Sequence, residues 1–265
     1  MAEDLSARIG AFGDPIARTP NLDQLAASGV RFPNTFTTAG VCAPSRAAFI
    51  TGVHQISLGA MHMRTSTSPV ARYMAVPPPE VKAFPELLRR AGYLTFTDRK
   101  LDYQFSGVFA GSGPETIWDV EEPALRLDQG LPDFIVRRPE GQLFFGLINF
   151  LITHESATFL PEHTTSDGGR RVASQAAAAR ASLPERTDPE AVIVPPYYPD
   201  EPGVRAHIAA HYDNVQLMDA QVGGIIRALA QHGELEHTII IWTTDHGDAL
   251  PRAKRELFDS GIRVP

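Results

Sequence analysis

Long apolar segments, in which hydrophobic residues do not alternate with polar ones, set the strongest limit on the fold. Two of them are QLFFGLINFLI (142–152) and TIIIWTT (238–244), and a shorter one spans Tyr93–Thr97. A strand that is apolar on both faces has to be covered on both faces, as in a parallel sheet flanked by helices. A bilayer-spanning helix takes about 20 apolar residues, so none of these runs is long enough to cross a membrane. We expect all three to be buried strands.

Predicted helices separate the apolar strands. TPNLDQLAASG begins with Thr19 as the expected N-cap and Pro20 as the first helical residue, a combination typical of a helix start. Ser45–Thr51 and Val204–His232 are expected to form further helices, and each is followed by a glycine stop. Helices that alternate with buried strands predict an α/β fold with a mostly parallel sheet and helices on both faces.

Polar residues follow three of the predicted strands. The clusters are Thr97–Asp102, Thr153–Ser156 and Thr243–Asp248. In parallel α/β sheets, ligands bind beyond the carboxyl ends of the strands. We therefore expect these three clusters to lie near one another and to carry the chemistry.

The composition excludes several classes of function. The formal net charge is −7 and hydrophobic residues make up 43% of the chain, which allows a sizeable core and disfavours broad binding to nucleic acid. A locally basic pocket for an anionic substrate remains compatible with an acidic protein. A single cysteine excludes an internal disulfide and a multi-cysteine metal site. The polar start, MAEDLSARIG, lacks the apolar region of a signal peptide.

Acidic residues form a candidate metal site. Asp245 and His246 leave a strand end together, and the pair Glu3-Asp4 would supply two more oxygen donors. A carboxylate-dominated site suits a hard cation such as Ca²⁺ or Mg²⁺, whereas His246 is also compatible with Zn²⁺. The alternative is that Asp245, His246 and Gly247 form a plain turn.

Basic residues on the same predicted loops form a candidate oxyanion site. Arg46, Lys100 and Lys254 together would hold an anion, Arg by its planar fork and Lys as point charges. His154, at a strand end, is a candidate acid or base. Each of the three cations alone would equally be a solvated surface charge, and His154 a hydrogen-bonded structural residue.

The segment GVCAPSRAAFITG (40–52) carries the only cysteine, Cys42. A lone cysteine is usually a small buried hydrophobe, but Cys42–Arg46 followed by Thr51-Gly52 matches the signature C-x-P-S-R-x-x-x-x-T-G. The chain thereby resembles the type I, formylglycine-dependent sulfatases of the alkaline phosphatase-like superfamily. The stretches TPNLDQLAASGVRFPNTFTTAG, YDNVQLMDAQVGGIIRALAQHGELEHTIIIWTTDHGD and KRELFDSGIRVP extend the resemblance over nearly the whole chain.

The resemblance implies a function and a set of site residues. A maturation enzyme would oxidise Cys42 to formylglycine, whose hydrated form attacks the sulfur of a sulfate ester, and whose second hydroxyl then expels sulfate. The substrate would be a sulfated small molecule or glycan, and the cofactor Ca²⁺ or Mg²⁺. The implied metal ligands are Glu3, Asp4, Cys42, Asp245 and His246. The implied catalytic residues are Cys42, Arg46, which orients the formylglycine, and Lys100, His154 and Lys254, which contact sulfate or transfer protons.

The chain departs from the family pattern at several places. The acidic pair is Glu3-Asp4 in place of Asp-Asp. Lys100-Leu101-Asp102 stands where many members have Lys-x-His, so Asp102 is a candidate base. The family's first strand, before Glu3, and its C-terminal subdomain are missing. We therefore interpret residues 1–265 as a sulfatase catalytic domain truncated at both ends, with a surface excursion at 168–200.

Two other readings stay open. The cysteine signature also occurs in phosphonate and phosphate ester hydrolases of the same superfamily. Alternatively, the chain is an inactive truncated homologue, whose Glu3-Asp4 pair would hang at a frayed terminus and bind metal poorly. His54, His62 and Arg64 are candidate contacts to an acidic sugar. The chain itself gives no cellular address, and the family resemblance favours a periplasmic or secreted protein if a signal peptide precedes Met1.

Overall fold

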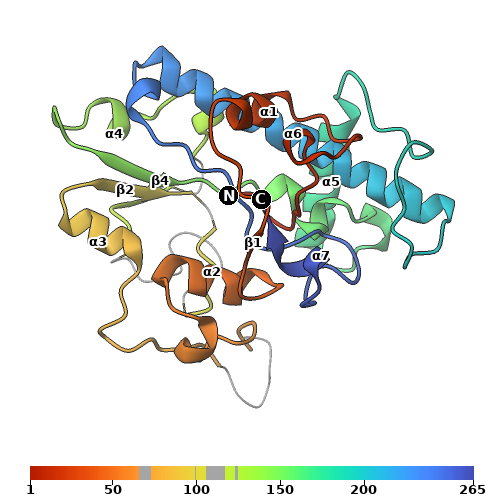
Figure 1. Cartoon of the computed structure of the whole chain (residues 1–265), viewed down its shortest axis with the longest axis horizontal. Coiled ribbons are helices and arrows are strands. Elements are labelled where there is room, and N and C mark those ends of the chain that lie inside the picture. Colours follow the sequence, from red (N-terminus) through yellow and green to blue (C-terminus); the bar gives the residue numbers. More distant parts are fainter. Residues whose placement is uncertain (66–72, 99, 106–116, 123–124) are drawn as a thin grey trace.

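The computed structural model describes residues 1–65, 73–98, 100–105, 117–122 and 125–265 (Figure 1). Its helices are α1 (Pro20–Ala27), α2 (Cys42–Thr51), α3 (Phe84–Arg90), α4 (Asp133–Val136), α5 (Asp167–Ala181), α6 (Pro202–Gln231) and α7 (Asp259–Ile262). Its strands are β1 (Thr35–Phe36), β2 (Leu94–Thr97), β3 (Val120–Glu121), β4 (Phe144–Leu147) and β5 (Arg263–Val264).

Three helices lie where the sequence predicts them. α1 begins at Pro20, and α6 covers most of the predicted Val204–His232. α2 ends at Thr51 as predicted, but it begins at Cys42, three residues before the predicted start at Ser45. The expected side-chain cap on α1 is absent, because the Thr19 hydroxyl accepts from the backbone NH of Gly10 instead. That contact fixes the loop before α1 to the start of the helix.

The central sheet is parallel and is extended by the first residues of the chain. The strands follow the order β3-β2-β4, with Leu94 paired to Phe144 and Phe96 to Val120. Ala2 then makes parallel bridges to Phe150 on one side and Thr244 on the other. Ala2, Phe150 and Thr244, which are far apart in the sequence, therefore lie side by side in the sheet.

The prediction of long buried strands is wrong in part. β4 has only four residues, and a 3-10 turn, Leu151–Thr153, follows it. Residues 238–244 form no strand beyond the bridge at Thr244, and Ile239 and Ile241 are 89% and 80% exposed. An open cavity of about 1530 Å³ borders Ile240, Ile241 and Trp242. An apolar run needs a hydrogen-bonded neighbour along its length to become a strand, and among the described residues this one has Ala2 alone.

Helices cover both faces of the sheet, as the sequence predicts (Figure 1). On one face Met1 packs with Leu147 of β4 and Ile50 of α2. On the other, Ala2 packs with Met218 of α6 and Leu22 of α1, among other residues. Successive residues of an extended segment point to opposite faces, so Met1 and Ala2 join two separate cores at the position where the site is built.

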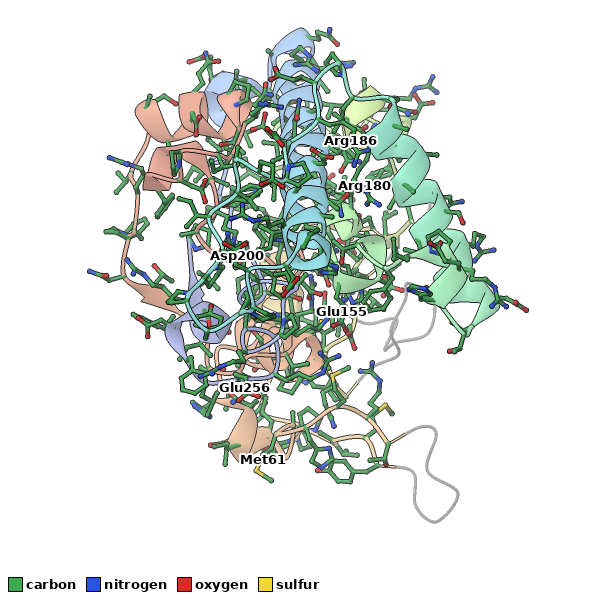
Figure 2. All side chains as sticks on the ribbon, turned by 90° about the vertical axis from the view of Figure 1, so that its right-hand side faces the viewer. Met61, Glu155, Arg180, Arg186, Asp200 and Glu256 are labelled. Atoms are coloured by element: carbon green, nitrogen blue, oxygen red, sulfur yellow. The ribbon has the colours of Figure 1, made fainter. Side chains whose placement is uncertain are left out.

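α5 packs along α6 and begins the predicted excursion at 168–200 (Figure 2). Its Ala173 and Ala176 are buried, and Arg180 donates to the Ala157 carbonyl and to the Asn214 side chain. The division into one domain over 1–265 with an excursion at 168–200 stays a prediction. None of the helices in the described part of the chain is long and apolar enough to span a bilayer.

A buried ion pair connects the segment that follows Ala2 to the loop that follows Thr244. The Asp248 carboxylate accepts from Arg8 Nε at 2.6 Å and from the Ser6 backbone NH at 2.9 Å. Burial by itself would raise the pKa of Asp248, but Arg8 and His211 outweigh it and hold that pKa far below its ordinary value. Folding therefore favours the ionised carboxylate.

Replacing Asp248 by Asn should lower the free energy of unfolding by about 3–5 kcal/mol, because Arg8 loses its buried partner. The folded pKa is depressed, so the contribution is complete above about pH 4 and is lost as the pH falls further. Urea unfolding between pH 7 and pH 3 measures both effects. The control is Asp133→Asn, whose partner Arg137 and own carboxylate are almost fully exposed. Equal losses in the two variants would contradict the prediction.

Candidate active site

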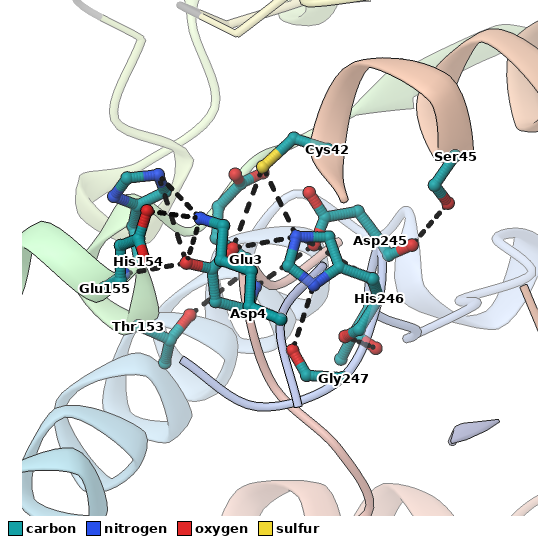
Figure 3. Close-up of polar contacts among 12 residues, drawn as sticks. Glu3, Asp4, Cys42, Ser45, Thr153, His154, Glu155, Asp245, His246 and Gly247 are labelled. Atoms are coloured by element: carbon teal, nitrogen blue, oxygen red, sulfur yellow. Dashed lines mark hydrogen bonds and ion pairs between the residues drawn. The ribbon is translucent and has the colours of Figure 1, made fainter. Parts of the chain in front are cut away.

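Two of the polar clusters, Thr153–Ser156 and Thr243–Asp248, meet at the N-terminus of α2 (Figure 3). The first cluster joins them through Lys100, which pairs with Glu3, although residue 99 lies outside the described residues. The three clusters thus lie near one another, as the sequence predicts. Ala2 accepts from the Asp245 backbone NH, which places the pair Glu3-Asp4 beside Asp245 and His246. One potential ligand atom from each of Asp4, Cys42, Asp245 and His246 lies within 4.8 Å of the others. All four residues are buried.

The acidic pair is fixed, so the expectation of a frayed terminus is wrong. Glu3 and Asp4 are fully buried. The Asp4 backbone NH donates to Asp245 Oδ1 at 3.1 Å, and Asp4 Oδ2 accepts from the Glu155 NH at 2.7 Å. Asp4 has a φ of +46°, in the left-handed region. A non-glycine residue in that region costs of order 1–3 kcal/mol and typically marks a functional site.

Glu3 is turned toward cations. Its two carboxylate oxygens accept separately from Arg46 and Lys100. One of its oxygens also lies within 4.8 Å of ligand atoms of Asp4, Cys42 and His154. The position of Glu3 is therefore compatible with its predicted role as a metal ligand, but in this structure its single negative charge is already shared between Arg46 and Lys100.

Cys42 is the first residue of α2, with its side chain over the acidic cluster. Its Sγ lies 3.3 Å from His246 Nε2 and 3.7 Å from Asp4 Oδ1. Burial raises the pKa of the Cys42 thiol, although Lys100 opposes the shift. A thiol that holds its proton is a poor nucleophile, so the unmodified side chain is unsuited to attack a substrate itself.

Arg46, one helical turn after Cys42, binds the site together. Its Nε donates to Asp245 Oδ2 at 3.2 Å and its Nη1 to Asn149 Oδ1 at 2.7 Å, while Nη2 pairs with Glu3. Asn149 in turn donates to Asp98. Sequence reasoning missed Asn149, whose only signal is that it is the one polar residue inside the apolar run 143–152.

The charges show what the acidic cluster lacks. Burial opposes the protonated form of His246, but Asp245 and Asp4 outweigh it and raise its pKa well above the ordinary value. The pKa of Asp245 is lowered, against burial, by His246 and Arg46. A site that draws a proton onto a buried imidazole is short of positive charge. Such a carboxylate-rich donor set fits a hard divalent cation.

The orientation of the His246 ring fits the same role. Its Nδ1 lies 3.0 Å from the Gly247 carbonyl oxygen, so Nδ1 carries a proton and Nε2 faces Asp4 and Cys42. A backbone carbonyl on the second ring nitrogen is how metal-binding histidines are usually oriented. Gly247 itself is required, because an added Cβ would lie 1.8 Å from the Ser260 oxygen.

Lys254 and His154 close the opposite side of the site. Lys254 Nζ lies 2.7 Å from Asp4 Oδ2, 3.1 Å from Glu155 Oε1 and 3.4 Å from His154 Nε2. Asp4 and Cys42 raise the pKa of Lys254 against the effect of burial, whereas burial lowers the pKa of His154. Lys254 is thus charged and His154 neutral at neutral pH. Glu155, which sequence reasoning missed, is a third partner of Lys254.

Asp102 is already paired, which disfavours its predicted role as a base. Its carboxylate accepts from Arg64 and lies 3.7 Å from Lys100 Nζ. Arg64 was a candidate contact to an acidic sugar, and one of its two terminal nitrogens is committed to Asp102. His62, another such candidate, packs against the Tyr73 ring at 5.1 Å.

Comparison with known proteins places this chain in a family. The family profile described as Sulfatase matches residues 1–265. An ulvan-active sulfatase of Formosa agariphila is 38% identical over all of this chain and 46% of its own length. A 2-O GAG sulfatase has a TM-score of 0.67 at 21% identity, over 100% of this chain and 62% of the other. A phosphonate monoester hydrolase of Agrobacterium radiobacter has a TM-score of 0.60 at 18% identity, over 100% and 66%.

The two solved structures show the fold, which is the α/β fold of the alkaline phosphatase-like proteins. The chain spans about half the length of the curated relatives it matches. A family profile that covers every residue, on a fold shared with solved sulfatases, is decisive for membership. The chain belongs to the sulfatase family.

Proposed function

We propose that the chain carries the active site of a sulfate ester hydrolase that acts on a sulfated glycan. The observation that supports this most is the position of Cys42, at a helix N-terminus within contact of Asp4 and His246. Lysines 100 and 254 lie around the same cluster. An anionic ester would therefore meet positive charge on two sides of the residue expected to attack it.

A divalent cation and a modified Cys42 belong to this proposal. Asp4, Asp245 and His246, with Glu3 and the modified Cys42, would hold a hard cation, Ca²⁺ in our proposal with Mg²⁺ as the alternative. When bound, the cation would acidify a hydroxyl and neutralise charge on sulfate oxygens. The formylglycine made from Cys42 by a maturation enzyme would supply that hydroxyl.

The residues of the chain would divide the remaining tasks. Arg46 fixes Asp245 and Glu3 by two buried ion pairs and so keeps the floor of the site rigid. Lys100 and Lys254 would bind the sulfate oxygens as their charge develops. Lys254 Nζ carries a proton, and the neutral His154 Nε2 lies 3.4 Å away. We propose that these two groups move the proton that the leaving alcohol requires.

The proposal is tested by producing the chain with a formylglycine-generating enzyme. The mass of the tryptic peptide Phe32–Arg46 reports whether Cys42 is converted. Sulfate release is then measured from sulfated oligosaccharides, in parallel with rates on aryl sulfate and aryl phosphonate esters. Conversion without any sulfate release would contradict the proposal, and a faster rate on the phosphonate would favour the phosphonate hydrolase.

Removing divalent ions should lower the melting temperature, and adding Ca²⁺ should restore it. An ion at 100 times its dissociation constant stabilises by about 2.7 kcal/mol, or about 5–10 °C in a chain of this size. The variant Asp245→Asn should lose the shift, because it removes one charged ligand, whereas the exposed control Asp133→Asn should keep it. An unchanged shift in Asp245→Asn would place the ion elsewhere.

A further inference from the structure

The loop 251–258 has one buried lysine and an exposed basic and aromatic border. Lys254 points into the site and is buried, whereas Arg252, Arg255 and Phe258 are exposed. Figure 2 shows Glu256 of this loop on the same side of the molecule as Glu155 of the site and as Asp200. The loop thus continues the active site outward onto the surface.

Arg252 lies between two aromatic rings. Its guanidinium carbon is 5.2 Å from the centre of the Tyr197 ring and 5.5 Å from that of Phe258. The two rings are 42% and 55% exposed. No carboxylate in the described part of the chain pairs with Arg252, whereas both terminal nitrogens of Arg255 are bound to Glu155. Arg252 is therefore an exposed cation that two aromatic rings hold and that pairs with no carboxylate among the described residues.

The backbone around Lys254 is strained to hold this arrangement. Arg252 and Arg255 have φ values of +58° and +77°. The loop is fixed in place by hydrogen bonds from the NH of Lys254 to the Asp248 carbonyl and from that of Arg255 to Gly40. Left-handed non-glycine residues cost of order 1–3 kcal/mol each and cluster at ligand sites. Two of them beside Lys254 point to a function of the exposed border.

We infer that Arg252, Tyr197 and Phe258 form a subsite for an anionic sugar residue of a sulfated saccharide whose ester lies at Cys42. This inference rests on the proposed function. The guanidinium fork matches a sulfate or carboxylate bidentately, and the exposed parts of Tyr197 and Phe258 that Arg252 leaves free would contact the apolar face of the sugar. The backbone of Arg252 lies within about 7 Å of that of Lys254, so a saccharide held at Lys254 would reach it.

The test measures binding without turnover. The chain with unmodified Cys42 is titrated with sulfated oligosaccharides prepared from ulvan and from heparin, and with inorganic polyphosphate of matched charge. Arg252→Ala should weaken saccharide binding about tenfold, because one charge-assisted contact is lost. Phe258→Ala should weaken it as well. Arg137→Ala, which removes another exposed arginine, just after α4, is the control and should bind like the wild type.

Each outcome decides the inference. Weaker saccharide binding by both Arg252→Ala and Phe258→Ala, with polyphosphate binding unchanged, supports the inference. It is overturned if the wild type binds neither saccharide, if Arg252→Ala and Arg137→Ala lose the same affinity, or if polyphosphate and saccharide suffer equally. A chain that binds saccharide through Arg252 but releases no sulfate after conversion of Cys42 would keep this subsite and refute the proposed function.

Discussion

Replacing Cys42 by alanine should lower kcat/KM for a sulfate ester on the order of a millionfold, as when the nucleophile of a hydrolase is deleted. The side chain at position 42 is the group held between Asp4 and His246 at the start of α2, and no hydroxyl would remain there to attack sulfur. The rate is measured as sulfate release from an aryl sulfate.

Cys42→Ser separates attack from release. A serine hydroxyl that displaced the alcohol would be left as a serine sulfate, with no second hydroxyl on the same carbon to expel the sulfate. We expect at most a single turnover per chain, with the mass of one sulfate retained on the peptide 32–46. Sustained turnover by this variant would refute the covalent mechanism. Thermal unfolding of both variants controls for the loss of a buried side chain.

Replacing Lys254 by alanine should lower kcat/KM by about 10²–10³, or about 3–4 kcal/mol, the usual effect of removing one donor to a developing oxyanion. The pKa of Lys254 is raised by Asp4 and Cys42, so the charge is present throughout the neutral range and the loss should not depend on pH between 6 and 9. Rates on an aryl sulfate across that range measure both statements.

A matched control for this variant is Lys82→Ala, which removes an exposed lysine before α3. It should leave kcat/KM within a factor of two. If Lys254→Ala lost activity only in proportion to a loss of folded protein, the lower rate would be due to misfolding caused by the Asp4 carboxylate, which has lost its partner. Thermal unfolding in the presence of Ca²⁺ therefore accompanies the kinetics, and an unchanged rate in Lys254→Ala would remove this residue from the mechanism.

Local signals in the sequence were sufficient for α1, α6 and the end of α2, and for the expectation that the polar clusters gather in one place. Pro20, after a polar residue, marks the start of α1 because the fixed φ of proline suits the first helical position. Gly52, after a run of small residues, marks the end of α2 because glycine readily adopts the left-handed conformation that follows a helix. The polar clusters at strand ends predicted that positions 154 and 246 would lie near each other, since parallel strands end at one edge, and the family resemblance implied that Cys42 joins them. Their chemical roles remain predictions.

The strand prediction at 238–244 failed because an apolar run indicates that a segment tends to be buried, but it does not indicate whether a partner strand lies beside that segment. Ile239 and Ile241 lie exposed because, among the described residues, Thr244 alone in this run is bridged, by Ala2. The sequence signal for a buried strand is the same whether or not a partner strand is present. Such an error is corrected only by knowing which segments lie adjacent in space.

The ion pairs within the site could not be read from the sequence either. Glu155 and Asn149 act through Lys254 and Arg46, partners that lie 99 and 103 residues away. Their residue types are common at surfaces and at strand ends, so composition and spacing do not distinguish them. The same holds for Asp102, whose pairing with Arg64 depends on the loop geometry between them.

Residues that bury Cys42 in the folded chain are synthesised well after it. Cys42 and His246 are separated by 204 residues, which takes on the order of 10–40 s to synthesise at ordinary elongation rates. Until the later segment emerges, no carboxylate or imidazole from it can enclose the thiol. The maturation enzyme that we propose for Cys42 would therefore have a period of seconds in which the side chain is accessible, before folding buries it.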